Sequence, residues 1–367
     1  MENQTVKQKE AVVNFGKSLI VPSVQQLAKQ PISKIPPRYV RQLDHHHEDH
    51  ALTTTISSVP VIDLQNLFAN TSSDISSDEL NKLHAASKEW GFFQVINHGI
   101  SESLLDDFKT EVLNFFNLPM DEKQKLWQEE DNHEGFGQLF VVSENQKLDW
   151  SDMFYITTLP HDLRKLRLFQ KLPLNLRETL EAYSAELKKL AVAILGQMAK
   201  ALGMDTQEVT DLFQDGVQSM RMNYYPLCPE PKLALGFSPH SDADALTILF
   251  QLNETEGLQI RKDGKWLTIK PLPNAFVVNV GDIMEIVSNG VYRSIEHRAT
   301  VNSNKERLSV ATFYSSGMGT ELGPAQSLVT QHKVANFRRV PLEDYFKEFF
   351  ARKLDGKSYL DFMKLGS

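Results

Sequence analysis

The chain has 367 residues, of which 41% are hydrophobic and 23% are charged, and its formal net charge is −8. This length can bury a large core and allows one large domain or two; the negative charge argues against a nucleic-acid partner, because binding a polyanion needs clustered Lys and Arg. Cys228 is the single cysteine, so no intrachain disulfide is possible, which suits a reducing compartment.

The first 55 residues are predicted to form an N-terminal extension. The opening stretch MENQTVKQKE is polar and lacks the layout of a signal peptide, and no run of about twenty apolar residues would span a bilayer. We therefore expect a cytoplasmic monomer that binds no membrane.

The extension contains an amphipathic stretch at 12–27 and four clustered histidines: His45, His46, His47 and His50. Such a cluster can bind metal adventitiously. An exposed loop is the stronger interpretation, because a flexible segment without a scaffold cannot hold a fixed coordination geometry.

Residues 56–210 are predicted to form a mainly helical region packed on the core. Apolar periodicity indicates a helix over 76–88 that Gly91 ends, a short strand over 92–97 and a helix after Ser101. His98 lies at a turn, where a backbone hydrogen bond is a better interpretation than a metal ligand. The clearest helix spans 173–202, with apolar residues every three or four positions, and we expect it to lie against a sheet.

After residue 217 the chain changes to short strands separated by Pro, Gly and Asn, which is typical of an all-β core. The predicted strands cover 219–225, 245–251, 258–262, 266–270, 275–280, 292–298 and 307–314. They suffice for two packed sheets, so we predict a jelly roll, or double-stranded β-helix, over residues 211–320. Residues 321–367 contain a predicted helix over 342–354 that is expected to close over this core. The expected fold is one integrated unit, a mostly β core with flanking helices.

Three residues have the order and spacing of a mononuclear metal site. His240 and Asp242 alternate along an extended segment, so their side chains share a face. His297 would complete the set. Two histidines and one carboxylate on one face of an octahedron leave three open positions, which is the arrangement of non-heme Fe(II) oxygenases.

Arg307 and Ser309 obey the same alternation ten and twelve residues after His297. A guanidinium matches a carboxylate in geometry, and a neighbouring hydroxyl can donate one more hydrogen bond, so this pair is typical of a clamp for a dicarboxylic co-substrate. Phe313, further along the same face, is a plausible apolar wall for the substrate, although ordinary core packing would explain it equally.

The motifs extend beyond these residues, and together they resemble the plant 2-oxoglutarate- and Fe(II)-dependent dioxygenases. The similar stretches include VPVIDL at 59–64, EWGFFQVINHGI at 89–100, RMNYYPLCPEP from residue 221, LGFSPHSDADALTILFQ and YRSIEHRATVNSNKERLSVATF. Within that family the chain most resembles the branch of senescence-related oxygenases, alkaloid O-demethylases and norcoclaurine-synthase-like proteins. The resemblance covers nearly the whole chain after the first fifty residues.

The resemblance implies Fe(II) as cofactor, 2-oxoglutarate and O2 as co-substrates, and ascorbate as a supporting reductant. It also places Tyr225 and Asn223, which share a face of the first core strand, at the 2-oxoglutarate; the alternative for Tyr225 is a residue that only lines the barrel. The implied reaction hydroxylates or O-demethylates a small apolar metabolite, related to alkaloids, phenylpropanoids or flavonoids, and yields succinate and CO2.

Candidate residues for the substrate pocket come from the same resemblance. They are Phe136, Gln138, Phe140 and Met153. Asp244 lies two residues after Asp242, where related sequences usually have a small or neutral residue. It is either the partner of a cationic substrate group or, as we favour, a carboxylate at a bend that is solvated or bonded to backbone.

Two other classes of function remain open on the sequence. One is a metabolite-binding or condensing protein of the same fold, which would need neither an intact metal triad nor Arg307. The other is a zinc hydrolase that uses the same ligands, which would need no carboxylate clamp and no O2.

Overall fold

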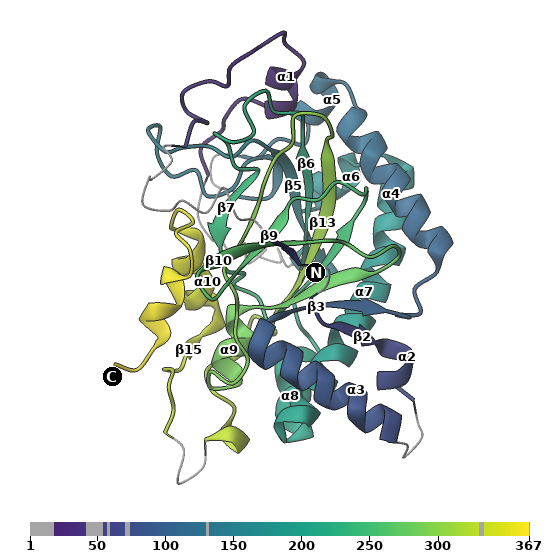
Figure 1. Cartoon of the computed structure of the whole chain (residues 1–367), viewed down its shortest axis with the longest axis vertical. Coiled ribbons are helices and arrows are strands. Elements are labelled where there is room, and N and C mark those ends of the chain that lie inside the picture. Colours follow the sequence, from purple (N-terminus) through teal and green to yellow (C-terminus); the bar gives the residue numbers. More distant parts are fainter. Residues whose placement is uncertain are drawn as a thin grey trace, which may run out of the picture.

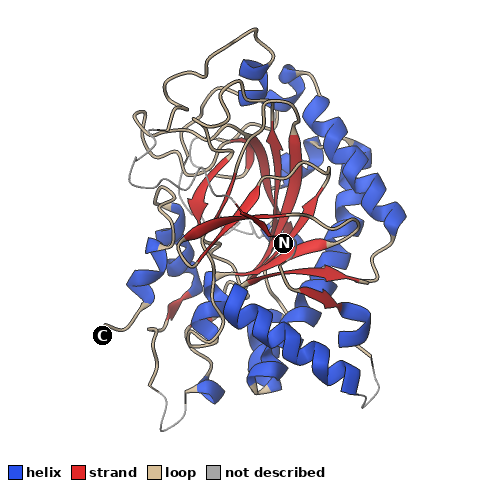
Figure 2. Cartoon of the chain, viewed as in Figure 1, coloured by secondary structure: helices blue, strands red, loops and turns tan. Residues whose placement is uncertain are grey.

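The computed structural model describes residues 18–41, 54–56, 59–69, 74–129, 132–329 and 334–366. Strands occupy its centre and helices lie around them (Figures 1 and 2). The predicted mostly β core with flanking helices is confirmed. The histidine cluster at 45–50 and residues 12–17 of the predicted amphipathic stretch lie outside the described residues.

Two sheets form the core. The larger has the strand order β2 (Val61–Asp63), β3 (Phe92–Ile96), β11 (Phe276–Val280), β8 (Leu246–Gln251), β13 (Arg307–Tyr314), β6 (Gln218–Tyr225), β5 (Asp152–Leu159) and β4 (Gly135–Gly137). The smaller has the order β1 (Thr54–Ile56), β10 (Lys265–Ile269), β9 (Leu258–Lys262), β12 (His297–Ala299) and β7 (Phe237–His240). The predicted division of the chain into regions at residues 210 and 320 stays a prediction. Four strands that precede residue 210, β2 to β5, nevertheless belong to the larger sheet of the core.

Helices cover the outer side of the larger sheet (Figure 1). The longer ones are α3 (Asp74–Ala85), which continues as a π-helical turn over Ala86–Trp90, α4 (Glu102–Asn117) and α7 (Leu174–Leu202), and the short α8 (Thr206–Phe213) packs on α7. The apolar stripe of α7 is buried, and Gly203 ends the helix at a φ of 69°, a left-handed conformation that glycine adopts without strain. No helix in the described parts of the chain combines the length and apolar character needed to cross a membrane.

Shorter elements complete the fold. They are α1 (Val24–Ala28), α2 (Leu64–Leu67), α5 (Met120–Gln124), α6 (Leu166–Lys171), α9 (Asp282–Val287), α10 (Leu342–Phe350) and the paired strands β14 (Glu321–Leu322) and β15 (Val340–Pro341), with 3-10 turns at His161–Leu163, Gln326–Leu328 and Ser358–Met363. The predicted C-terminal helix thus ends at Phe350, four residues earlier than expected.

The predicted strand over 292–298 is wrong for most of its length, since β12 begins only at His297. Two backbone N–H groups before it bond to side chains instead of to a neighbouring strand. Tyr292 N donates to Ser288 Oγ at 3.0 Å, and Ser294 N donates to Glu285 Oε2 at 2.7 Å. Both acceptors belong to α9 or to the residue that caps it.

The N-terminal segment 18–41 is attached to the core through Asp152, at the start of β5. This carboxylate accepts hydrogen bonds from Ser23 Oγ at 2.6 Å, Val24 N at 2.8 Å and Gln25 N at 2.9 Å. Asp152 thereby satisfies free N–H groups at the start of α1. Apolar side chains of the segment, including Val24 and Tyr39, pack beside Trp150.

We expect Asp152→Ala to destabilise the protein by about 1–3 kcal/mol, because three buried donors lose their acceptor. Urea unfolding measures this loss, and limited proteolysis should show faster cleavage within residues 18–41. Asp162→Ala, at an exposed carboxylate, should change neither. An Asp152→Ala protein as stable and as protease-resistant as wild type would contradict the attachment.

Candidate metal centre

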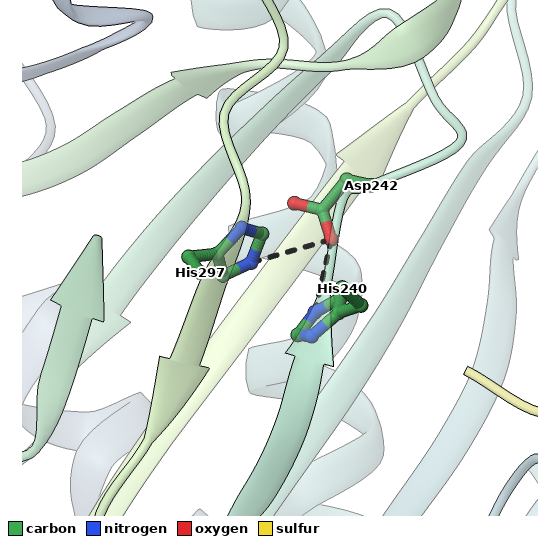
Figure 3. A group of neighbouring side chains, drawn as sticks. All are labelled: His240, Asp242 and His297. Atoms are coloured by element: carbon green, nitrogen blue, oxygen red, sulfur yellow. Dashed lines mark ion pairs between the residues drawn. The ribbon is translucent and has the colours of Figure 1, made fainter. Parts of the chain in front are cut away.

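Two histidines and one aspartate converge between the sheets. His297 on β12 lies directly opposite His240 on β7, and their ring centroids are 4.2 Å apart. Asp242 follows in the loop after β7, and one of its carboxylate oxygens faces both imidazoles (Figure 3). Asp242 Oδ1 lies 3.4 Å from His240 Nε2 and 3.6 Å from His297 Nε2. The three ligand atoms therefore lie within 4.8 Å of one another.

Hydrogen bonds behind these residues select the atoms that face the centre. His240 Nδ1 bonds to Ser238 O at 2.8 Å, and His297 Nδ1 bonds to Ile295 O at 3.1 Å. Because a carbonyl only accepts, each Nδ1 carries the proton and each Nε2 presents a lone pair. The residues present fit a divalent metal ion.

The aspartate is oriented by its second oxygen. Asp242 Oδ2 accepts from Thr247 Oγ1 at 2.6 Å and from Asn279 Nδ2 at 2.8 Å. This leaves Oδ1 as the oxygen available to a metal. The sequence analysis did not identify Thr247 and Asn279. They lie on β8 and β11 of the larger sheet, whereas Asp242 follows β7 of the smaller sheet.

Electrostatics keep His297 and Asp242 in the protonation states that metal binding requires. Burial and the neighbouring His240 together lower the pKa of His297 to about 4, so the imidazole is neutral at pH 7. Burial alone would raise the pKa of Asp242, but its interactions with His297 and His240 and the hydrogen bond from Thr247 hold it well below its usual range. The aspartate is therefore ionised.

The loop that carries Asp242 is held by the first turn of α9. Asp282 N donates to Asp242 O at 2.8 Å, and Ser241 Oγ donates to Asp282 Oδ2 at 3.0 Å. Gly281 permits this close approach, because a Cβ there would stand 1.9 Å from Asp244 O. The backbone then bends over residues 243–245, before β8 begins at Leu246.

The metal ligands line one cavity with the predicted co-substrate clamp. Antiparallel pairing places Arg307 on β13 opposite Tyr225 on β6, and Ser309 opposite Asn223. All four line the cavity. The smaller sheet thus supplies the histidines, and the larger sheet supplies the clamp.

Arg307 is buried and only partly satisfied. Its Nη1 donates to Ser309 Oγ at 3.3 Å and its Nη2 to Gln251 Oε1 at 3.2 Å, while its guanidinium lies 5.0 Å from the centre of the Tyr225 ring. Its Nε, also buried, has no hydrogen-bond partner. A buried guanidinium with a free donor requires an acceptor, which a carboxylate would provide.

A second buried guanidinium, that of Arg221, lines the same cavity and was missed by the sequence reasoning. It lies 3.7 Å from the Phe237 ring centre, and its Nε donates to Asn223 Oδ1 at 2.7 Å. Among the described residues, no carboxylate lies within ion-pair distance of it. The alternation that identified Asn223 and Tyr225 also includes Arg221. Two guanidiniums make the cavity suitable for a dianion.

The predicted substrate-pocket residues lie in three different places. Phe313 lines the cavity, and it also packs against an aromatic cluster that contains Phe140 and Met153. Phe136 lies instead in the main core beside Phe115, Phe116 and Trp127. Gln138 is bonded through Nε2 to the carbonyls of Asp149 and Ser151, at 3.0 Å each.

Asp244 does not belong to the residues that line the cavity. Burial raises the pKa of its carboxyl to about 8, and the negative charge of Asp242 adds to the shift. The backbone bends at this residue, as the favoured interpretation of the sequence requires. His98, in agreement with its interpretation, bonds to the backbone at Ile100 N and Asn274 O.

Comparisons with known proteins agree with this geometry. The profile of the 2OG-Fe(II) oxygenase superfamily matches residues 216–316, and that of the N-terminal region of the non-haem dioxygenases in morphine synthesis matches residues 59–175. The chain is 50% identical to oxoglutarate-dependent flavonoid 7-O-demethylase 1 of Ocimum basilicum, over 100% of this chain and 97% of the relative. It is 52% identical to codeine O-demethylase of Papaver somniferum, over 96% of this chain and 99% of the relative.

A solved structure shows the same fold. JOX2 in complex with 2OG, Fe and JA superimposes with a TM-score of 0.84 and 35% sequence identity, covering 94% of this chain and 98% of JOX2. The expected resemblance to plant dioxygenases is therefore confirmed at the level of sequence and of structure.

We expect His297→Ala to weaken metal binding by more than about 100-fold, since losing even a partner behind a ligand costs 10–100-fold. Titration of the metal-free protein with Co(II), followed by visible absorption, measures this directly. His98→Ala is the matched control, because that histidine bonds only to backbone. Equal Co(II) affinity in His297→Ala and wild type would exclude this centre.

Proposed function

This chain belongs to the 2OG-Fe(II) oxygenase superfamily and is an oxidoreductase of the iron- and 2-oxoglutarate-dependent class, and we propose that it hydroxylates or O-demethylates a small, largely apolar specialised metabolite. The observation that carries the proposal is the shared cavity, in which three unprotonated metal-ligand atoms face a carboxylate clamp.

We assign the metal to His240, Asp242 and His297. The distal carboxylate of 2-oxoglutarate binds Arg307, whose free Nε supplies the missing bond, with Ser309 and Tyr225 beside it. Asn223 holds Arg221 in place through its Oδ1. Among these residues, Arg307 Nε is the buried donor that has no acceptor in the described structure.

Iron bound at the triad supplies the oxidative chemistry of this class, in which O2 oxidises a substrate C–H bond while 2-oxoglutarate becomes succinate and CO2. The chain's own residues orient the reactants and exclude water. Phe92, Leu249, Leu258 and Ala311 give the cavity apolar walls. Oxidation of a methoxy carbon gives an unstable hemiacetal that releases formaldehyde, so hydroxylation and O-demethylation differ only in the substrate.

The substrate enters from the aromatic side of the cavity. Phe313 connects the cavity to the cluster of Phe140, Met153, Phe349 and Phe350. Phe349 and Phe350 belong to α10, which acts as the lid that the C-terminal region contributes. An aromatic wall fits a flat, apolar metabolite better than a sugar or a peptide. The flavonoid and alkaloid O-demethylases among the relatives support O-demethylation. Ascorbate as a supporting reductant, a monomer and a cytoplasmic location complete the proposal.

We expect Arg307→Ala to weaken 2-oxoglutarate binding at least about tenfold, because hydrogen bonds to charged groups contribute about 1.5–3 kcal/mol each. Adding 2-oxoglutarate to the anaerobic Fe(II) protein and titrating the visible charge-transfer band measures the affinity. Arg261→Ala is the control, since that arginine pairs with Glu296 outside the cavity. A wild-type protein that binds iron but shows no band would favour the binding or condensing alternative.

We expect Asp244→Asn to change kcat/KM by the same factor for amine-containing and neutral methoxylated substrates, because Asp244 does not line the cavity. Formaldehyde and succinate release from a panel of methoxylated alkaloids and flavonoids checks this. A loss confined to the amines would show that Asp244 pairs with a substrate cation.

A further inference from the structure

Arg41, at the end of the described N-terminal segment, joins two remote parts of the chain. Its Nη2 donates to Asp149 Oδ1 at 2.7 Å, to Ser238 Oγ at 2.8 Å and to Leu148 O at 3.3 Å. Its backbone N donates to Leu233 O at 2.8 Å. One side chain therefore holds the loop before β5 against β7.

Ser238 continues this network to the metal centre. Its hydroxyl donates to Asp149 Oδ1 at 2.6 Å while accepting from Arg41, so both functions of the hydroxyl are used. Its carbonyl accepts from His240 Nδ1 at 2.8 Å. A chain of hydrogen bonds thus runs from Arg41 through Asp149 and Ser238 to His240.

The place of β7 in the sheet makes this support important. The strand is only four residues long and lies at the edge of the five-stranded sheet, paired with β12 alone. The C-terminal segment adds one bond, from Gly356 N to Pro239 O at 3.1 Å. An edge strand with so few ladder bonds needs side-chain contacts to fix its position.

We propose that Arg41 is a positioning residue for the metal centre: with Asp149 it fixes Ser238, whose carbonyl sets the tautomer and ring orientation of His240. The proposal rests on the assignment of His240 as a metal ligand. The Arg41–Asp149 pair is largely shielded, with 27% and 16% of the side chains exposed, so solvent screens it less than a surface ion pair. The N-terminal segment is then a part of the catalytic unit and not an appendage.

Arg38 provides a matched control. It lies three residues earlier in the same segment and contacts the same loop, at Ser143 O, Gln146 O and Glu144 Oε2. None of these contacts reaches β7. Losing Arg38 therefore weakens the docking of the segment without removing a bond to Ser238.

The test compares Arg41→Ala, Ser238→Ala, their double variant and Arg38→Ala in the full chain. Titration of each metal-free protein with Co(II), followed by visible absorption, gives metal affinity, and thermal unfolding of the same metal-free samples gives stability. We expect Arg41→Ala and Ser238→Ala each to weaken Co(II) binding by about tenfold, because the Ser238 carbonyl that bonds His240 stays in place but is no longer held in position; this is the lower end of the 10–100-fold cost of losing such a partner outright. The double variant should be no weaker than Arg41→Ala, because both act through one network.

Arg38→Ala should lower the unfolding temperature as Arg41→Ala does, yet bind Co(II) as tightly as wild type. Wild-type affinity in Arg41→Ala, or equal weakening in Arg38→Ala, would overturn the positioning role and leave the metal site standing. A wild-type chain that binds no Co(II) would overturn the metal assignment itself, so the two failures are distinguishable.

Discussion

The negative charge of Asp242 inside an apolar cavity is the constraint around which this protein is built. A buried carboxylate is stable only when neighbours compensate its charge. Thr247 and Asn279 use one oxygen, and the two imidazoles face the other. The same arrangement disfavours protonation of the aspartate and directs three ligand atoms toward one point, so electrostatic stability and metal affinity have one structural cause.

The division of the site between the two sheets follows from this constraint. The histidines come from paired short strands of the smaller sheet, whereas Arg307 and Ser309 come from a long central strand of the larger one. The separation between the metal-ligand side chains and the clamp residues therefore depends on how the sheets pack. Phe92 of the larger sheet, whose ring lies 5.3 Å from that of His297 in an edge-on contact, helps to fix this packing.

Features that report local burial were predictable from the sequence. The helix at 174–202 and the strands at 218–225 and 307–314 appear close to their expected positions because their side-chain periodicity reflects the face they bury. The metal and clamp residues lie in three short pieces of the chain, at 240–242, 297 and 307–309, and their order and spacing predicted that they form one site.

Features that depend on remote contacts or unusual backbone were not predictable. Phe136, which the family resemblance placed at the substrate pocket, lies between Gly135 and Gly137, whose φ values are 125° and 150°, and its side chain packs in the main core. No local pattern indicates that Asp149 meets Ser238. The strand expected over 292–298 is mostly replaced by backbone bonds to side chains of the preceding helix region.

The aromatic wall has a consequence for the evolution of such proteins. Its members come from the loop at Phe140, from β13 and from α10, and Phe140 stacks on Phe350 with their ring planes only 1° apart. None of these rings belongs to a residue assigned to the metal centre. On our proposal that this wall contacts the substrate, mutations in it alter which molecule is accepted while the oxidising centre is inherited unchanged, so gene duplicates can acquire new substrates without first losing their chemistry.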